Sequence, residues 1–192
     1  MATSPIRTIC WSPIWNKRHE KFGLEHLVLN KSAADSVIVA INEDDTPFRL
    51  DYHLRWAQSG CVLEADLVLV TGQTKRTMGL RADGRGRWKH ADGQPIPELD
   101  GCIDVDIWPT PFTNSFPIWR TPMTKGQREA FRMAWIDGTA LTVEAKSQAY
   151  TRLAERRYRF ESLDGSGFQA ELSLDEDGLV LDYPGLFQRV DP

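Results

Sequence analysis

The sequence predicts a single all-β domain that spans residues 1–192 and consists of antiparallel hairpins with little helix. Turn-forming groups of Gly, Asn and Asp recur at short intervals, where they supply positive φ angles and local side-chain hydrogen bonds. Between these groups, apolar and polar residues alternate with the two-residue period of half-buried strands. The turn groups lie at residues 42–47, 83–86, 91–93, 164–167 and 175–178.

In the N-terminal half, the clearest strand covers residues 50–56. Charged or polar residues occupy one face of this strand, and the other face carries Leu50, Tyr52, Leu54 and Trp56. Such alternation is typical of a strand with one face on the core. Residues 37–41 and 67–70 are instead continuously apolar, which predicts strands that are covered on both faces.

The C-terminal half contains three further alternating segments, at residues 103–107, 158–160 and 168–174. Residues 127–136 are compatible with two structures, a short helix capped by Thr124 or a strand. Because this segment is short and lies between Gly126 and Gly138, we favour the strand.

Composition excludes several classes of protein. Lys and Arg number 23 and Asp and Glu number 27, so the net charge is -4. A nucleic-acid-binding protein would need a basic stripe, and none is present. No apolar run approaches the roughly 18 residues that a membrane-spanning helix requires. The first residues contain no apolar signal core, so we expect a cytoplasmic protein.

Familiar catalytic and metal-binding motifs are absent from the sequence. Cys10, Cys61 and Cys102 are too widely spaced to form a zinc clip or a redox pair. No phosphate-binding loop, dinucleotide-binding motif or nucleophile elbow occurs. We therefore predict no catalytic residue, no metal and no cofactor.

The segment from residue 100 to residue 122 differs from the rest of the chain. Asp104 and Asp106 lie two residues apart on a predicted strand, so they share one face about 6–7 Å apart. Prolines then force the chain out of regular pairing, and we expect it to run extended. The segment holds Pro109, Pro111, Pro117 and Pro122, with Trp108, Phe112, Phe116 and Trp119 and the polar residues Thr110, Thr113, Asn114 and Ser115.

Two interpretations of this segment are open. It could form a stiff wall beside a cleft, with rings that stack on a ligand and polar groups that bond its hydroxyls, a mix that suits a sugar-lipid. It could also be a crossover that packs its rings into the core, which the residues alone favour because aromatic side chains are most often buried. The two Asp residues meet the distance of roughly 5–10 Å between glycosidase carboxylates. As a cation site they supply too few oxygen ligands.

Several motifs resemble those of a bacterial family described as putative glycolipid-binding. The central motifs are Gly101–Asp106, Thr110–Asn114 and Pro117-Ile118. The resemblance extends over nearly the whole chain, through Trp11, Gly23–His26, Trp88, Gln148–Leu153, Arg157–Ser162 and Asp177–Phe187. It implies an antiparallel sheet wrapped on itself as a spiral β-roll, with residues 127–136 as a strand. It also implies a role in glycolipid metabolism or transport, and it identifies no catalytic residues.

Together these observations favour non-enzymatic binding of an amphipathic ligand, such as a glycolipid. The apolar tail would contact aromatic rings and the head would meet polar groups. The predicted binding residues are Glu25, Asp104, Asp106, Trp108, Thr110, Phe112, Thr113, Asn114 and Arg120. Two alternatives stay open. One is an enzyme that acts on sugar-lipids through Asp104, Asp106 or Glu25, and the other is a structural or interaction protein without a small ligand.

Overall fold

The computed structural model describes residues 6–15 and 22–190, and in these residues fourteen strands form one sheet. The N-terminal strands are β1 (Arg7–Pro13), β2 (Gly23–Leu29), β3 (Ala33–Ile41), β4 (Pro47–Trp56), β5 (Val62–Thr71), β6 (Thr74–Ala82) and β7 (Trp88–His90). The C-terminal strands are β8 (Asp104–Trp108), β9 (Arg128–Asp137), β10 (Thr142–Ala154), β11 (Arg157–Ser162), β12 (Gln169–Leu174), β13 (Val180–Tyr183) and β14 (Phe187–Val190). The helical elements are a short helix α1 (Ser115–Arg120) and two 3-10 turns, η1 (Pro97–Leu99) and η2 (Phe112–Asn114).

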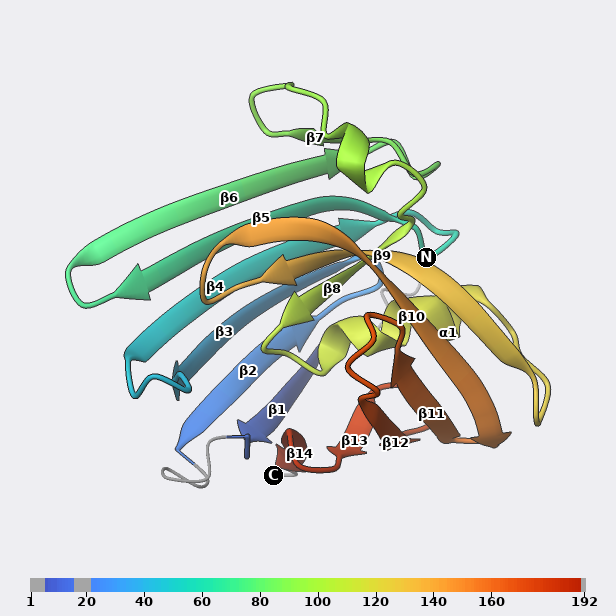
Figure 1. Ribbon diagram of the computed structural model, residues 1–192. Coiled ribbons are helices and arrows are strands. Elements are labelled where there is room, and N and C mark those ends of the chain that lie inside the picture. The colour runs from blue at the N-terminus through green and yellow to red at the C-terminus, as the bar shows by residue number, and fades with distance from the viewer. Residues whose placement is uncertain (1–5, 16–21, 191–192) are drawn as a thin grey trace.

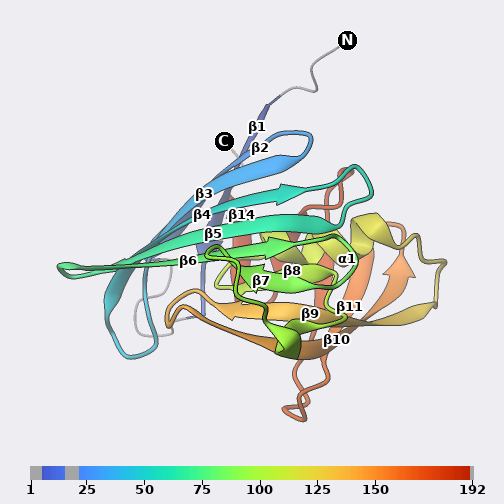
Figure 2. The same ribbon diagram turned by 90° about the horizontal axis from the view of Figure 1, so that it is seen from above.

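The order of strands in the sheet is β7-β6-β5-β4-β3-β2-β1-β14-β13-β12-β11-β10-β9-β8. Neighbouring strands are antiparallel, including the pair β1–β14 that joins the two halves, and the exception is the parallel pair β8–β9. The chain passes directly from β7, at one edge of the sheet, to β8, at the other edge. The sheet therefore wraps around on itself. Its β8 edge, with β9 and the helix α1, lies inside the roll, between strands β1–β6 and strands β11–β14 (Figure 1, Figure 2). This arrangement confirms the all-β spiral roll and the strand at residues 127–136.

We call β8 and β9, with the adjoining half of β10, the inner wall. Its two faces are covered differently, because the roll places it between the two halves of the sheet. On one face, Val105, Ile107, Ala134 and Ile136 join the N-terminal core beneath β1–β6. The other face of the inner wall lies toward the C-terminal core of β10–β14. This core contains Tyr150, Phe160, Tyr183 and Phe187.

The prediction that residues 37–41 and 67–70 are covered on both faces is wrong. Val39 on β3 is 47% exposed, and Val68 and Val70 on β5 are half-buried. These strands lie in the outer layer of the roll, where one face packs on the core and the other meets solvent. Strong β-formers on that outer face make the runs continuously apolar without a second layer.

Gly138 fixes the corner where the inner wall meets the N-terminal sheet. A Cβ atom at this position would lie 2.4 Å from Leu50 Cδ2 and 2.6 Å from the carbonyl oxygen of Trp108. Only glycine fits so close an approach. The Gly138 N–H donates to that same carbonyl at 2.7 Å, so the ends of β8 and β9 are joined where Gly138 packs against Leu50 of β4.

None of the helices in the described residues is long and apolar enough to cross a membrane. Within residues 6–15 and 22–190, no group of three or more His, Cys, Asp or Glu side chains is placed to hold a metal ion.

Candidate ligand-binding pocket

The chain folds into a compact turn after β8 instead of running extended as the sequence suggested. A cis peptide bond joins Trp108 to Pro109. The Thr110 hydroxyl then accepts the Phe112 N–H at 3.1 Å, and the Asn114 amide donates to the Pro111 carbonyl at 3.2 Å. Proline is tolerated in a first helical turn because its missing N–H is not needed there. Pro111 therefore lies at the start of η2 and Pro117 in the first turn of α1, rather than in an extended wall.

This turn sends its aromatic rings to two different places. Phe112 and Phe116 are fully buried in the N-terminal core, where their ring centroids lie 6.2 Å and 5.3 Å from that of Trp56. Trp108 lies on the other face of the inner wall, 5.9 Å from Phe187 and 5.0 Å from Trp15. The segment thus fills the core on one side and borders an open space on the other.

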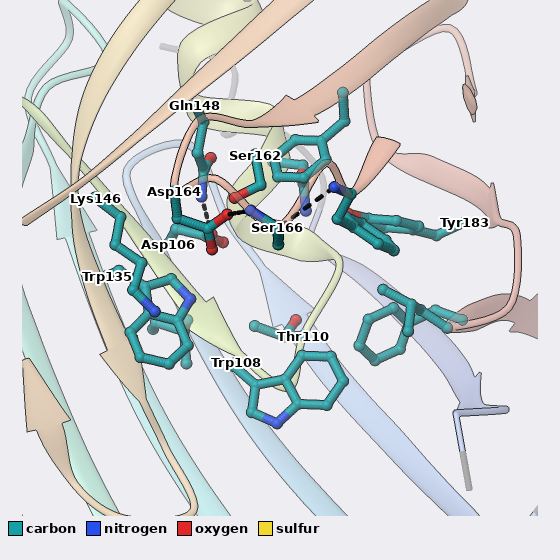
Figure 3. Close-up of a pocket in the computed structure, with 16 residues that line it drawn as sticks. Asp106, Trp108, Thr110, Trp135, Lys146, Gln148, Ser162, Asp164, Ser166 and Tyr183 are labelled. Carbon is teal, nitrogen blue, oxygen red and sulfur yellow. Dashed lines mark hydrogen bonds between the residues drawn. The ribbon is translucent and has the colours of Figure 1, made fainter. Parts of the chain in front are cut away.

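That space is a pocket of about 290 Å³ between the inner wall and strands β11–β14. Figure 3 shows Trp108, Trp135 and Tyr183 around it, with Asp106 and Gln148 at one end. The pocket is lined by Asp106, Ile107, Trp108, Thr110, Asn114, Trp135, Lys146, Gln148, Phe160, Ser162, Asp164, Ser166, Phe168, Tyr183, Leu186 and Phe187.

One end of the pocket is polar, and we call Asp106, Asn114 and Gln148 its polar end. The Gln148 amide donates to Asp106 Oδ2, and the Thr113 hydroxyl donates to Oδ1 at 3.1 Å. The Tyr150 hydroxyl donates to Asn114 Oδ1 at 2.9 Å. Burial raises the pKa of the Asp106 carboxyl, although the bonds from Gln148 and Thr113 and the charge of Lys146 oppose this shift.

The turn between β11 and β12 forms the rim of the pocket. The Leu163 N–H donates to the Ser147 carbonyl at 3.0 Å, which pins this turn to β10. Asp164 Oδ1 accepts the Ser166 N–H at 2.9 Å. Hydrogen bonds from Ser166 and Ser162 lower the pKa of Asp164 to about 2, so this carboxylate is ionised at neutral pH. Phe168, which is 39% exposed, completes the rim.

Glu25 lies behind the pocket rather than in it. Its Oε1 accepts hydrogen bonds from Thr110 at 2.8 Å, Tyr52 at 2.5 Å and Ser36 at 2.9 Å. Its Oε2 is buried and has no hydrogen-bond partner among the described residues. Burial is the main reason that the pKa of Glu25 rises to about 7, although the three hydroxyl groups oppose the shift.

Asp104 and Arg120 form an ion pair outside the pocket. Arg120 Nη2 lies 2.7 Å from Asp104 Oδ2, and Arg120 Nε donates to Oδ1 at 3.2 Å. The Asp104 side chain is 1% exposed. The pair ties Asp104 on β8 to the C-terminal end of α1.

The structure thus divides the residues that the sequence suggested. The pocket lining includes Asp106, Trp108, Thr110 and Asn114. Glu25 and Thr113 stand behind this lining, where they bond Thr110 and Asp106. Phe112 and the Asp104–Arg120 pair lie elsewhere. The sequence patterns did not point to the lining residues on β9, on β10 and in the β11–β12 turn, above all Trp135, Lys146, Gln148 and Asp164. The one signal for them was the turn motif at 164–167.

Comparison with known proteins completes the description of this chain. The model of a protein family described as putative glycolipid-binding matches residues 8–189. The crystal structure of a DUF1089 family protein from Pseudomonas aeruginosa is similar, with 44% sequence identity and a TM-score of 0.86. The match covers 92% of this chain and 96% of that one. A comparison with curated proteins found no match.

Proposed function

The chain belongs to the family described as putative glycolipid-binding, and from this premise we propose that it binds an amphipathic glycolipid without catalysis. The sugar head occupies the pocket between the inner wall and strands β11–β14. The apolar tail leaves over the rim. Such binding serves glycolipid metabolism or transport, and the cytoplasmic location expected from the sequence is part of the proposal.

The lining of the pocket, which is polar at one end and aromatic along its walls, is the observation that supports this proposal. Its polar end offers a carboxyl and two amides, whereas its aromatic walls are formed by Trp108, Phe160, Tyr183 and Phe187. Sugar rings have apolar faces that stack on aromatic side chains and hydroxyl edges that bond polar groups. A filled interior would favour an interaction protein without a ligand, and this space is open.

The rim supplies a surface for the tail. Phe168 lines the mouth of the pocket and keeps 39% of its surface exposed. Its ring centroid lies 6.0 Å from that of Phe160 and 6.4 Å from that of Tyr183, so the rim continues the aromatic walls outward. An alkyl chain on this surface gains about 0.8 kcal/mol for each buried methylene group.

A series of alkyl β-D-glucosides of increasing chain length, measured by isothermal titration calorimetry below micelle formation, tests the proposal. We expect affinity to rise about fourfold per methylene while the tail is on the rim, since 0.8 kcal/mol corresponds to that factor. Phe168→Ala should flatten this dependence on chain length. Leu24→Ala is the matched control, because Leu24 is an apolar side chain of 45% exposure on the far strand β2. Failure of every glucoside to bind would overturn the proposal.

Hydrolysis of a sugar-lipid is the second candidate function, and one observation favours it. Two carboxyl groups line the pocket from different elements, Asp106 on β8 and Asp164 in the β11–β12 turn. Their pKa values are shifted in opposite directions, Asp106 upward and Asp164 downward, as an acid and its ionised partner require. Release of 4-nitrophenol from nitrophenyl glycosides, abolished in Asp106→Asn, would support it. Recovery of intact glycoside after prolonged incubation would exclude it for these substrates.

A further inference from the structure

The lining also indicates which kind of head the pocket accepts, an inference that rests on the proposed function. We infer that the pocket takes one uncharged sugar ring and discriminates against phosphorylated and other anionic headgroups. Three features support this: the size of the space, the hydrogen-bonding pattern of its polar end, and the charges around it.

The size of the pocket limits the head to one ring. Its volume of about 290 Å³ lies just below the roughly 300–1,000 Å³ that ligand pockets span. The aromatic walls, with Trp135 opposite, border this space, which is open at the rim. A chain of sugars or a buried acyl tail would exceed it, so further sugars or the tail must continue past the rim.

The polar end matches hydroxyl groups. A carboxyl group offers roughly four acceptor positions, and Thr113 and Gln148 each donate one bond to Asp106. The remaining positions can accept hydroxyl protons from a ligand. The amides of Gln148 and Asn114 have two N–H bonds each. One of them already donates to Asp106 and to the Pro111 carbonyl, respectively, and the second N–H of each amide can donate to a hydroxyl oxygen. Adjacent hydroxyls on a sugar ring both donate and accept, and therefore fit this mixed set.

The charges disfavour an anionic head. Phosphate sites generally use arginine forks, lysines or clustered backbone N–H groups. Among the lining residues that the structure describes, Lys146 is the only cationic side chain. Its Nζ is already engaged, 3.2 Å from the centroid of Trp135 and 3.2 Å from Glu144 Oε1. A phosphate in the pocket would instead meet the Asp106 carboxyl and the ionised Asp164.

Three ligands with the same tail separate these contributions: octyl β-D-glucoside, octyl phosphate and 1-octanol. We expect calorimetry at low ionic strength to give the glucoside an affinity about tenfold or more above the other two. Asp164→Asn removes the ionised carboxylate and keeps an oxygen that can accept the Ser166 N–H. In this variant, the gap between glucoside and phosphate should narrow about threefold or more.

Asp92→Asn is the matched control for that variant. Asp92 also accepts a backbone N–H two residues ahead, from Gln94 at 3.0 Å, in an exposed turn, and it lies outside the pocket lining. We expect this control to leave all three affinities unchanged. If octyl phosphate or octanol binds as tightly as the glucoside, the inference is wrong while the proposed binding of an amphipath stands. If none of the three binds, the proposed function itself fails.

Discussion

The two faces of the inner wall border regions of opposite character, although both belong to the same stretch of sequence. On the face toward β1–β6, Phe112 and Phe116 fill the N-terminal core and no ring atom meets solvent. On the face toward β10–β14, Trp108 borders a pocket that the rest of the sheet leaves open. An aromatic residue therefore fills the core or lines the pocket according to the face on which the backbone turn places it.

Two carboxyl groups, those of Glu25 and Asp106, show the same contrast between an enclosed side and an open side. Glu25 is enclosed on the N-terminal side, and its hydrogen-bond partners are hydroxyl groups that are themselves buried. Asp106 is only half-buried, because it lines the pocket, and it lies within the field of Lys146. A group that opens on a pocket can bond a ligand, whereas the enclosed one can only gain or lose a proton.

Truncating one ring on each side tests the contrast with the largest expected effect. Phe112→Ala should lower the free energy of unfolding by about 3–5 kcal/mol, because it leaves a cavity in a sealed core. Trp108→Ala should cost less, since Trp108 is half-buried, but it should weaken binding of octyl glucoside about tenfold. Urea unfolding and calorimetry measure the two effects. Equal losses of stability in both variants would show that Trp108 is a core residue too.

The pH dependence of stability sharpens the contrast between the carboxyl groups. The pKa of Glu25 is 4.5 before burial and about 7 in the folded chain. Between these values the native state binds more protons than the unfolded state, so the free energy of unfolding falls as pH rises. At about 1.4 kcal/mol per unit of pKa, the total loss is about 3 kcal/mol, complete above pH 7.

Urea titrations from pH 4 to pH 8 measure this loss as the difference between wild type and Glu25→Gln. The variant should lack the decline, because glutamine does not ionise. Its stability at any single pH is no test, since its new N–H group would occupy the place of the unpartnered Oε2 and would cost about 1–3 kcal/mol throughout. If the free energy of unfolding changed with pH in the same way in wild type and in Glu25→Gln, the side chain of Glu25 would not be the group that takes up the proton on folding.

The smallest effect on stability is expected from Lys146, which lines the pocket. Lys146 Nζ lies over the ring of Trp135, and such contacts at exposed sites contribute about 0.5–1 kcal/mol. Lys146→Met should therefore reduce the free energy of unfolding by at most about 1 kcal/mol in urea unfolding. A loss as large as that for Phe112→Ala would mean that the pocket wall is packed as tightly as the core.

Much of the fold was predictable because alternation is a local property of the chain. The period-two pattern of residues 50–56 identified β4 and its inward face correctly. The sequence of a strand does not reveal what lies against its outward face. For this reason the continuous apolar run at residues 37–41 was expected to be covered on both faces. The prolines at 109 and 111 were assigned an extended chain, although their fixed φ suits a helical turn equally well.

The pocket was less predictable, because it depends on pairings between distant residues. Asp106 was identified as a candidate, but its neighbours follow from the register of β8 on β9, in which Asp106 pairs with Trp135. The next pairing, β9 on β10, brings Lys146 and Gln148 to the same face. No local motif marks these registers, so the residues of β10 could be found only in the folded chain.

The pairing of β1 with β14 has a consequence for how the chain reaches this structure. The strands β1–β6 form a meander of neighbours, but their inner face is covered only when β8 and β9 arrive, and β1 acquires its second partner only from the last strand. Contacts between residues so distant in sequence slow folding, to roughly milliseconds to seconds in all-β domains. A half-synthesised chain therefore presents a wide apolar surface to its surroundings, and we expect molecular chaperones to be important during its synthesis.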